Sequence, residues 1–179
     1  NDRKPDIVTV APGQQMQVSI FDFANNKFLL GPFLLNDSQG GPPTVADFDG
    51  DRHPDIGTAG TDAYRVFTLK CWNLTKAPCD LNTRGLLWSK RTQDSSSGIT
   101  GSSVFDFNGD GRAEVVYRDE CWLRVYNGPD GKTLFATSVT SVTALELPVV
   151  ADVDSDGHAD IVVSADKTFP QGLCSGFPE

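Results

Sequence analysis

Short apolar runs separated by polar turns recur along the whole chain. Residues 17–23 alternate polar and apolar side chains, and residues 28–35 repeat this signal after an Asn-Asn turn. Such alternation is typical of half-buried β-strands. No window carries apolar residues at i, i+3, i+4 and i+7 over three turns, so no amphipathic helix is predicted. Further strands are predicted at residues 64–69, 85–90, 122–126 and 133–137, the last two joined by a turn at 127–131.

Three acidic segments interrupt this pattern, at residues 47–55, 106–114 and 152–160. Each places an acidic or amide side chain at its positions 1, 3, 5 and 9. Two like charges ~4 Å apart repel by about 4 kcal/mol at an effective dielectric of ~20, and a bound cation reverses the sign of that energy. Ca²⁺ takes about six to eight oxygen ligands at spacings of this kind. The segments, called the first, second and third loops below, therefore predict three calcium sites.

The loops belong to a repeat in which each unit reads strand, loop, strand, strand, strand. Position 1 recurs after 59 residues and then after 46, and an insertion at residues 73–83 lengthens the first interval. A period of about 40–50 residues with four strands per unit is typical of β-propeller blades. We therefore expect an all-β fold, a partial β-propeller of about three to four four-stranded antiparallel blades. The strands flanking the loops are predicted at residues 44–46, 56–58, 103–105, 115–117, 149–151 and 161–163.

The first residues of the chain read as the second half of a fourth loop. Asp2 occupies position 5 and Asp6 position 9 of this partial repeat, at residues 1–6. We expect a partial fourth calcium site there, and we expect residues 1–179 to be a single propeller segment of a longer chain. The remaining blades would then come from the same chain or from other subunits.

The form of the loops, apolar-Asp-x-(Asp/Asn)-x-Asp-x-x-x-(Asp/Glu)-apolar, resembles the FG-GAP/VCBS repeats of integrin α-like β-propellers. The resemblance covers nearly the whole chain. It implies that each loop joins adjacent strands of one blade and binds Ca²⁺, and that the protein is extracellular and serves adhesion or ligand recognition. It also implies side-chain ligands at positions 1, 3, 5 and 9 and a carbonyl ligand at position 7. These residues are Asp47, Asp49, Asp51, His53 and Asp55; Asp106, Asn108, Asp110, Arg112 and Glu114; and Asp152, Asp154, Asp156, His158 and Asp160.

One position of the first loop departs from the other two loops. Position 6 is Gly111 in the second loop and Gly157 in the third, but it is Arg52 in the first. A sharp turn favours glycine, and Gly50 is a candidate for relieving the turn in the first loop. The resemblance does not extend to the Phe-Gly and Gly-Ala-Pro signatures of integrins themselves, so it is to calcium-loop propellers as a class.

The formal charge of −9 is concentrated in the loops, which hold nearly half of the 24 acidic residues. The rest of the chain has no clustered run or stripe of Lys and Arg, so nucleic acid is not expected as a partner. No run of ~20 apolar residues is present, so this segment is not expected to span a membrane. The expected partners are an extracellular protein or glycan ligand, together with further blades or further copies of the chain.

The four cysteines are Cys71, Cys79, Cys121 and Cys174, and none forms a Cys-x-x-Cys pair. Together with calcium loops they favour an oxidising, extracellular or periplasmic setting, and the localisation expected for the protein is extracellular or at the cell surface. Of the three possible connectivities we favour Cys71–Cys79, which closes a small loop, with Cys121–Cys174 by elimination. Free buried thiols stay open as the alternative.

Catalysis is not expected. The two histidines, His53 and His158, lie at position 7 of loops, where the backbone carbonyl is the expected ligand and the ring points away. The chain has no HExxH, P-loop or GxSxG motif. Asp119, Glu120 and Glu146 are candidates for a carboxylate pair of the kind that hydrolyses glycosides, but exposed acids in turns are the favoured interpretation.

Trp72, Trp88 and Trp122 are interpreted as core residues between blades, with sugar-stacking platforms as the alternative. Asn36 and Asn73 begin glycosylation sequons, whose use stays open. The sequence thus predicts a calcium-stabilised extracellular β-propeller that serves adhesion or ligand binding without catalysis. The alternatives are a non-catalytic propeller segment of a secreted carbohydrate-active enzyme and a structural subunit of a cell-surface filament.

Overall fold

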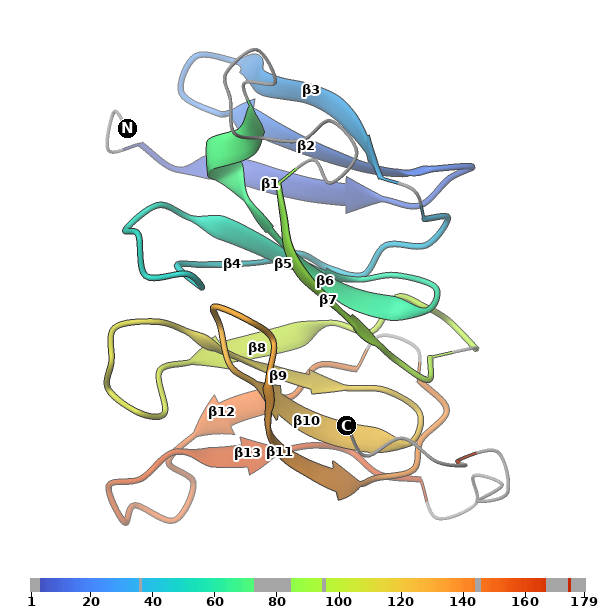
Figure 1. Cartoon of the computed structure of the whole chain (residues 1–179), viewed down its shortest axis with the longest axis vertical. Coiled ribbons are helices and arrows are strands. Elements are labelled where there is room, and N and C mark those ends of the chain that lie inside the picture. The colour runs from blue at the N-terminus through green and yellow to red at the C-terminus, as the bar shows by residue number, and fades with distance from the viewer. Residues whose placement is uncertain are drawn as a thin grey trace.

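The computed structural model describes residues 4–35, 37–72, 85–94, 96–143, 146–166 and 174. This part of the chain is all-β, with four antiparallel sheets and one short 3₁₀ helix. The sheets stack in chain order along the long axis of the molecule (Figure 1). No helix in these ranges is long and apolar enough to cross a membrane.

Within each sheet the strands lie in sequence order, so every paired strand is the chain neighbour of its partner. Sheet one contains β1 (Asp6–Ala11), β2 (Met16–Asp22) and β3 (Lys27–Leu35). Sheet two contains β4 (Thr44–Ala46), β5 (Asp55–Ala59), β6 (Ala63–Thr68) and β7 (Leu86–Arg91), with the 3₁₀ helix η1 (Leu69–Trp72) after β6. Sheet three contains β8 (Ser102–Phe105), β9 (Glu114–Arg118), β10 (Trp122–Tyr126) and β11 (Thr133–Ser138). Sheet four contains β12 (Val149–Ala151) and β13 (Asp160–Val162).

The predicted strands are confirmed to within one residue at each end. One small difference is residue 69, which was expected to end a strand and instead begins η1. The predicted turn after β10 is also confirmed, because the amide of Asn127 donates to the carbonyl of Lys132 at 2.8 Å and Gly131 adopts a φ of 67°. The four-strand unit is complete in sheets two and three, whereas the described residues form three strands in sheet one and two in sheet four.

A large aromatic cluster fills the space between sheets two and three. The ring of Tyr64 lies 4.9 Å from that of Tyr117 and 5.9 Å from that of Trp88, measured between centroids. Trp88 is buried, and its indole donates a hydrogen bond of 2.6 Å to the carbonyl of Gly128 in the next sheet. The interpretation of Trp88 as a core residue is therefore confirmed. Trp122 is only half-buried and lies beside the guanidinium of Arg124, and the side chain of Trp72 lies outside the described residues.

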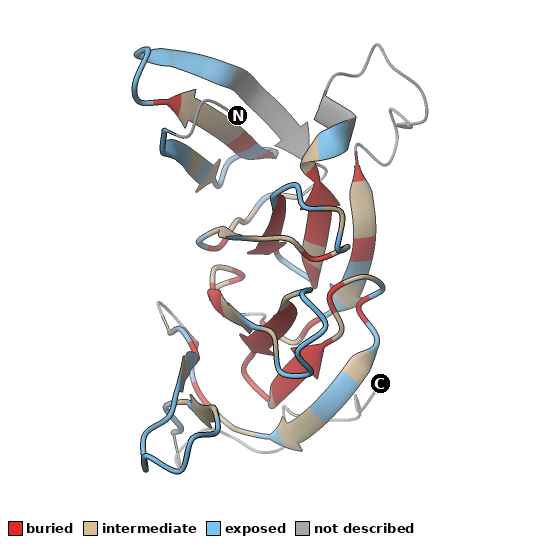
Figure 2. Cartoon of the chain, turned by 90° about the vertical axis from the view of Figure 1, so that its left-hand side faces the viewer, coloured by how far each residue is buried: buried red, intermediate tan, exposed pale blue. Residues whose placement is uncertain are grey.

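Two smaller apolar clusters join the outer sheets to the inner pair. Met16 and Val18 of β2 pack with Ile56 and Phe67 between sheets one and two. Between sheets three and four, buried residues of β9 and β10 pack with half-buried residues in and beside the fourth sheet and with one that follows β11. The buried residues are Val116, Leu123 and Val125, those of the fourth sheet and its edge are Val150, Ile161 and Val163, and the one after β11 is Val139. Figure 2 shows the result, with buried segments concentrated in the two middle sheets and exposed segments toward both ends of the stack.

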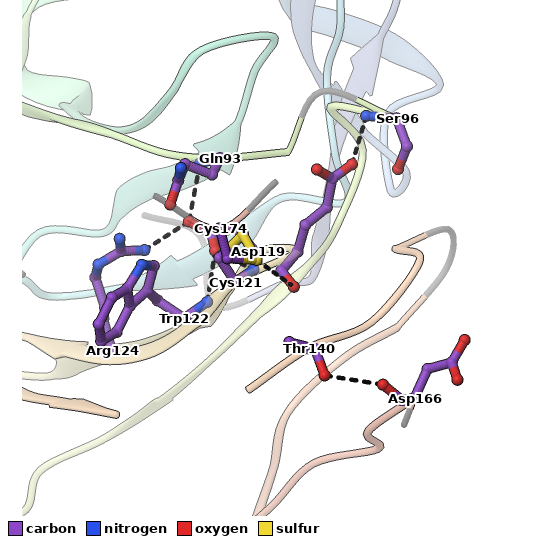
Figure 3. Close-up of a disulfide and its surroundings, with 10 residues drawn as sticks. Gln93, Ser96, Asp119, Cys121, Trp122, Arg124, Thr140, Asp166 and Cys174 are labelled. Carbon is purple, nitrogen blue, oxygen red and sulfur yellow. Dashed lines mark hydrogen bonds and ion pairs between the residues drawn. A yellow bond between two sulfur atoms is a disulfide. The ribbon is translucent and has the colours of Figure 1, made fainter. Parts of the chain in front are cut away.

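A disulfide links the third sheet to the C-terminal segment. Cys121, directly before β10, is bonded to Cys174 across a sequence separation of 53, with a Cα–Cα distance of 5.3 Å (Figure 3). This pairing confirms the one predicted by elimination. The second predicted pairing, Cys71–Cys79, lies outside the described residues, as do the sequon asparagines Asn36 and Asn73.

The interpretation of Asp119 and Glu120 as exposed turn acids is wrong, because both side chains are buried. Asp119 forms an ion pair with Arg124 and accepts the amides of Cys121 and Trp122 at 2.9 and 2.8 Å (Figure 3). Glu120 accepts the amide of Ser96 at 2.6 Å. These carboxylates organise the turn between β9 and β10 and tie it to the segment after β7.

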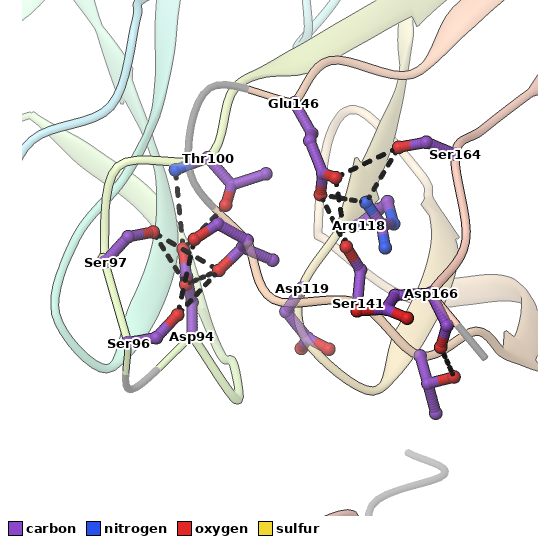
Figure 4. A network of polar contacts seen from close by, with 12 residues as sticks. Asp94, Ser96, Ser97, Thr100, Arg118, Asp119, Ser141, Glu146, Ser164 and Asp166 are labelled. Carbon is purple, nitrogen blue, oxygen red and sulfur yellow. Dashed lines mark hydrogen bonds and ion pairs between the residues drawn. The ribbon is translucent and has the colours of Figure 1, made fainter. Parts of the chain in front are cut away.

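Two further carboxylates organise the connections around sheet three (Figure 4). Asp94 is buried and accepts hydrogen bonds from the hydroxyls of Ser97, Thr100 and Thr143. Glu146 forms an ion pair with the buried Arg118 of β9 and accepts the hydroxyls of Ser141 and Ser164. The third acid considered for catalysis is therefore also engaged in structural contacts.

Two Tyr→Phe substitutions are expected to have opposite effects on stability. The hydroxyl of Tyr64 bonds to that of Ser102 in the next sheet at 2.7 Å, so Tyr64→Phe should lower the free energy of unfolding by about 1 kcal/mol. The hydroxyl of Tyr117 is buried without a hydrogen-bond partner, so Tyr117→Phe should leave the stability unchanged or raise it by up to about 1 kcal/mol. Urea unfolding followed by tryptophan fluorescence measures both, and equal losses would contradict the assignment.

Candidate metal sites in the acidic loops

The three acidic loops occupy equivalent places in sheets two, three and four. Each joins the first strand of its sheet to the second: β4 to β5, β8 to β9 and β12 to β13. All three project from the same side of the stack, at the left in Figure 1. In the partial repeat Asp6 begins β1, and Asp2 lies outside the described residues.

The carboxylate at position 1 closes each loop by accepting several backbone amides. Asp47 accepts the amides of positions 4, 5 and 6, and Asp106 does the same in the second loop. Asp152 accepts those of positions 5 and 6. The N···O distances all lie between 2.7 and 3.1 Å. These bonds turn the backbone around the first acid of each loop, so that the other acids face inward.

Positions 3 and 5 repeat the same arrangement two residues apart. The position 3 oxygen of Asp49, Asn108 or Asp154 accepts the position 5 amide at 2.8–3.1 Å. The position 5 carboxylate of each loop then accepts the amide of position 7, at 2.6, 2.9 and 2.8 Å in chain order. The position 7 residues, His53, Arg112 and His158, are thus held by their amides, and their carbonyl ligation stays a prediction.

The acid at position 9 ties the end of each loop to its beginning. Asp55, Glu114 and Asp160 each accept the amide of position 2, at 3.0, 2.8 and 3.0 Å. Asp55 and Glu114 are fully buried. Burial, together with repulsion from neighbouring acids of the same loop, raises the pKa of both carboxyl groups above their ordinary values, although the amide of position 2 opposes this rise.

Two positions of every loop adopt left-handed backbone conformations. Position 4 has φ values of 82°, 72° and 64° in the three loops, and position 6 has values of 67°, 83° and 88°. Arg52 therefore takes at position 6 the conformation that Gly111 and Gly157 take in the other loops. The expectation that Gly50 relieves this turn is wrong, because Gly50 serves position 4 and Arg52 still adopts a positive φ.

The side-chain oxygens converge as a hard cation requires. In the first loop, oxygens of Asp47, Asp49 and Asp51 lie within 4.8 Å of one another, and Asp152, Asp154 and Asp156 form the same group in the third. In the first loop, Oδ1 of Asp55 is buried without a hydrogen bond, and Oδ2 of Asp51 is buried with only the ammonium of Lys70 beside it. Buried oxygens of this kind need a cation or a donor. The donor set of the first and third loops therefore fits a metal ion that prefers oxygen.

The second loop differs because an amide replaces one carboxylate. Nδ2 of Asn108 lies 3.3 Å from Oδ2 of Asp110 and 3.4 Å from Oε1 of Glu114, and it donates to both. The Asn108 side chain thus offsets part of the acid–acid repulsion. The second loop also carries one negative charge fewer than the first and third loops. Its oxygen donors still occupy the same four positions.

Three contacts around the first loop were not predicted from the sequence. The Lys70 ammonium lies against Asp49 and Asp51. The amide of Ala113 in the second loop donates to the carbonyl of Asp47 at 3.0 Å and so joins the two loops. The sequence predicts that the ring of His53 points away from the loop. The ring is exposed, but its Nδ1 lies 3.2 Å from Oδ1 of Asp51. The first two contacts join residues distant in sequence, which the local spacing of the acids does not report.

The left-handed positions generate a pair of opposite predictions. A non-glycine residue pays about 1–2 kcal/mol in this region, so Arg52→Gly should raise the free energy of unfolding by up to about 1 kcal/mol once glycine's backbone entropy is subtracted. Gly111→Ala should lower it by about 1 kcal/mol, because a Cβ there meets no atom within 4 Å and only the backbone term changes. Denaturant unfolding of both variants, with and without chelator, checks the signs. A loss of stability in Arg52→Gly would contradict the argument.

The comparisons with known proteins agree with this repeat. Residues 106–163, which run from the second loop through the third, match the model of the FG-GAP-like repeat. No curated protein matches the chain in sequence. Among solved structures the chain is similar to the V. cholerae biofilm matrix protein Bap1, with a TM-score of 0.52 and 23% sequence identity. The match covers 84% of this chain but 22% of Bap1, so the likeness concerns the fold of a part of that protein. The resemblance indicated by the loop spacing is thus confirmed, and the chain carries an FG-GAP-like repeat at residues 106–163.

Proposed function

We propose that each of the three loops binds one calcium ion, through the side-chain oxygens at positions 1, 3, 5 and 9 and a carbonyl at position 7. The observation that carries this proposal is the convergence of carboxylate oxygens in the first and third loops, together with the equivalent place of all three loops in successive sheets. All donors are oxygen atoms, which suits Ca²⁺ better than the softer metals that need Cys or His nitrogen. A partial fourth site at Asp6 and Asp2 belongs to the same proposal.

The calcium in this proposal is structural. Each ion would neutralise acids that otherwise repel one another at the start of a strand pair. At a Kd near 10⁻⁴ M, calcium at ten times that concentration stabilises the folded chain by about 1.4 kcal/mol per site. Without the ions, the buried acids at position 9 oppose folding at neutral pH, because burial favours their protonated forms.

We further propose that the four sheets are blades of a β-propeller. The strands run in sequence order within each sheet, as they do in a blade. The first strands of successive sheets are neighbours, since β4 contacts β8 and β8 contacts β12. Such a row of first strands is what a propeller places around its axis. The similarity to part of Bap1 supports a modular role of this kind within a larger protein.

The proposed biological role is extracellular adhesion or ligand binding, with a protein or a glycan as ligand and without catalysis. The setting is supported by the Cys121–Cys174 disulfide and by the fold shared with a biofilm matrix protein. The non-catalytic part is supported by the acids outside the loops, because Asp94, Asp119 and Glu146 are engaged in ion pairs and hydroxyl contacts.

A second candidate role, a subunit of a surface assembly, is favoured by one observation. The outer side of sheet four and of the third loop carries exposed apolar side chains, with Val149 53% and Val153 63% exposed. Val162, the cross-strand partner of Val149, adds to this surface. Exposed apolar side chains on a short two-stranded sheet suit a further blade or a second copy of the chain.

The calcium proposal predicts that removal of the Glu114 charge has opposite effects on stability without calcium and with it. Because burial raises the pKa of Glu114, the calcium-free folded chain loses stability as the pH rises through that pKa. Glu114→Gln keeps an acceptor for the position 2 amide but removes the charge. The variant should therefore be at least as stable as the wild type in chelator at pH 7, and less stable by about 1.4 kcal/mol in calcium at ten times the Kd.

Thermal unfolding with calcium and with excess chelator measures both arms. Asp62→Asn is the matched control, since Asp62 is a largely exposed acid outside the loops. Its response to calcium should equal that of the wild type. A wild-type protein whose unfolding temperature ignores chelator would refute the metal proposal.

The ligand-binding proposal is tested on arrays of glycans and extracellular matrix proteins. We expect retention on at least one class of probe in millimolar calcium, and weaker retention in chelator. Chromatography of the same glycans after incubation should show no new products. An array that stays blank with calcium present would contradict adhesion. Regular polymers in electron micrographs of the same sample would favour the surface-assembly role.

A further inference from the structure

A lysine side chain lies against the acids of the first loop. Nζ of Lys70 is 3.6 Å from Oδ2 of Asp49 and forms a shorter ion pair with Oδ2 of Asp51. In the described ranges, no Lys or Arg forms an ion pair with an acid of the second or third loop. The first loop thus has a counter-ion built into the chain, unlike the two loops that otherwise copy its geometry.

The strand register and a core contact bring Lys70 to this place. Thr68, the last residue of β6, lies opposite Asp55 at position 9 of the first loop, and η1 begins directly after it. Leu69 packs on the apolar cluster between sheets one and two, and the amide of Lys70 donates to the hydroxyl of Thr68 at 3.3 Å. The helix is therefore anchored beside the loop.

The next sheet has no equivalent of this lysine. The pairing of Val115 with Tyr126 in sheet three places Asn127 opposite the position 9 residue, Glu114. Two residues further on, where sheet two has Lys70, sheet three has Pro129 in the turn after β10. The ammonium therefore comes from the connection between β6 and β7, which the other complete sheet replaces with a short turn.

The oxygen that Lys70 approaches most closely has no other partner. Oδ2 of Asp51 is buried and accepts no hydrogen bond. A metal ion in the first loop would take the same position 5 carboxylate as a ligand. An ammonium and a divalent cation repel each other strongly at such short range, so they cannot share these oxygens. The Lys70 side chain is 45% exposed and can move into solvent when a metal enters.

We propose that Lys70 competes with calcium for the first loop, an inference that rests on the proposed calcium sites. The ammonium keeps this loop assembled when calcium is scarce. The second and third loops have no such ammonium and bind calcium first. The first loop fills last, because its calcium must displace an existing ion pair. Calcium thus acts on the loops in an order that Lys70 sets.

The inference is tested by calorimetric titration of the calcium-free protein with calcium. The wild type should show its weakest binding step at the first loop, which Asp49→Asn removes, while Asp154→Asn removes a tighter step. Lys70→Met should tighten the first-loop step by about five- to ten-fold, since two partly exposed ion pairs no longer oppose the metal. Lys90→Met, on β7 of the same sheet, should leave every step unchanged.

Amide hydrogen exchange in chelator gives a second readout that needs no calcium. The amides of Gly50, Asp51 and Arg52 donate to the Asp47 carboxylate and report whether the first loop is closed. In the wild type they should exchange more slowly than the matching amides of the third loop. Lys70→Met should remove this difference, whereas saturating calcium should restore slow exchange in both proteins.

The outcomes separate this inference from the calcium proposal itself. Calcium binding at the second and third loops with a first-loop affinity that Lys70→Met leaves within two-fold would overturn the role of Lys70 and preserve the calcium proposal. Absence of calcium binding at every loop would overturn both. Unchanged exchange of the first-loop amides in calcium-free Lys70→Met would likewise overturn the built-in counter-ion.

Discussion

Repulsion among the acids of each short loop is the constraint around which the rest of this structure is arranged. Backbone amides offset part of this repulsion, since the acids at positions 1, 3, 5 and 9 all accept amide hydrogen bonds within their own loop. These bonds define the loop but leave negative charge converging on one point. Because position 9 begins the second strand of the sheet, the loop and the strand pair form together. A cation at the loop therefore stabilises a sheet as well as a turn.

The loops also affect the packing between sheets, most clearly through position 2 of the first loop. Phe48 is fully buried in the aromatic cluster that joins sheets two and three. The equivalent residues of the other two loops are less buried, since Phe107 is 38% exposed and Val153 is 63% exposed. The bond from the amide of Ala113 to the carbonyl of Asp47 adds a direct link between two loops. Ordering one loop therefore supports its neighbour.

The carboxylates outside the loops stabilise connections between strands through partners within the protein. Asp119 and Asp94 are buried and fully engaged, the first by Arg124 and backbone amides and the second by hydroxyls. Removal of such a partner leaves a buried charge uncompensated, which is costly. These acids hold the connections between strands, on segments that carry no repeat. The acids that converge in the loops, for which we propose a cation, thus differ from Asp94 and Asp119, which are paired within the protein.

Strand positions, loop spacing and the FG-GAP-like repeat could all be read from the sequence, because each is a local pattern of alternation or of acids two residues apart. The positive φ at position 6 could be predicted from the glycines of the second and third loops, but not from Arg52 in the first loop. The burial of Asp119 and Glu120 and the approach of Lys70 to Asp51 could not be predicted locally. They depend on register between strands and on core contacts such as that of Leu69, which bring together residues distant in sequence. The sequence by itself determined the elements and the loop chemistry, and the tertiary structure decided which acids have a partner, because only packing excludes water and places a cation beside a carboxylate.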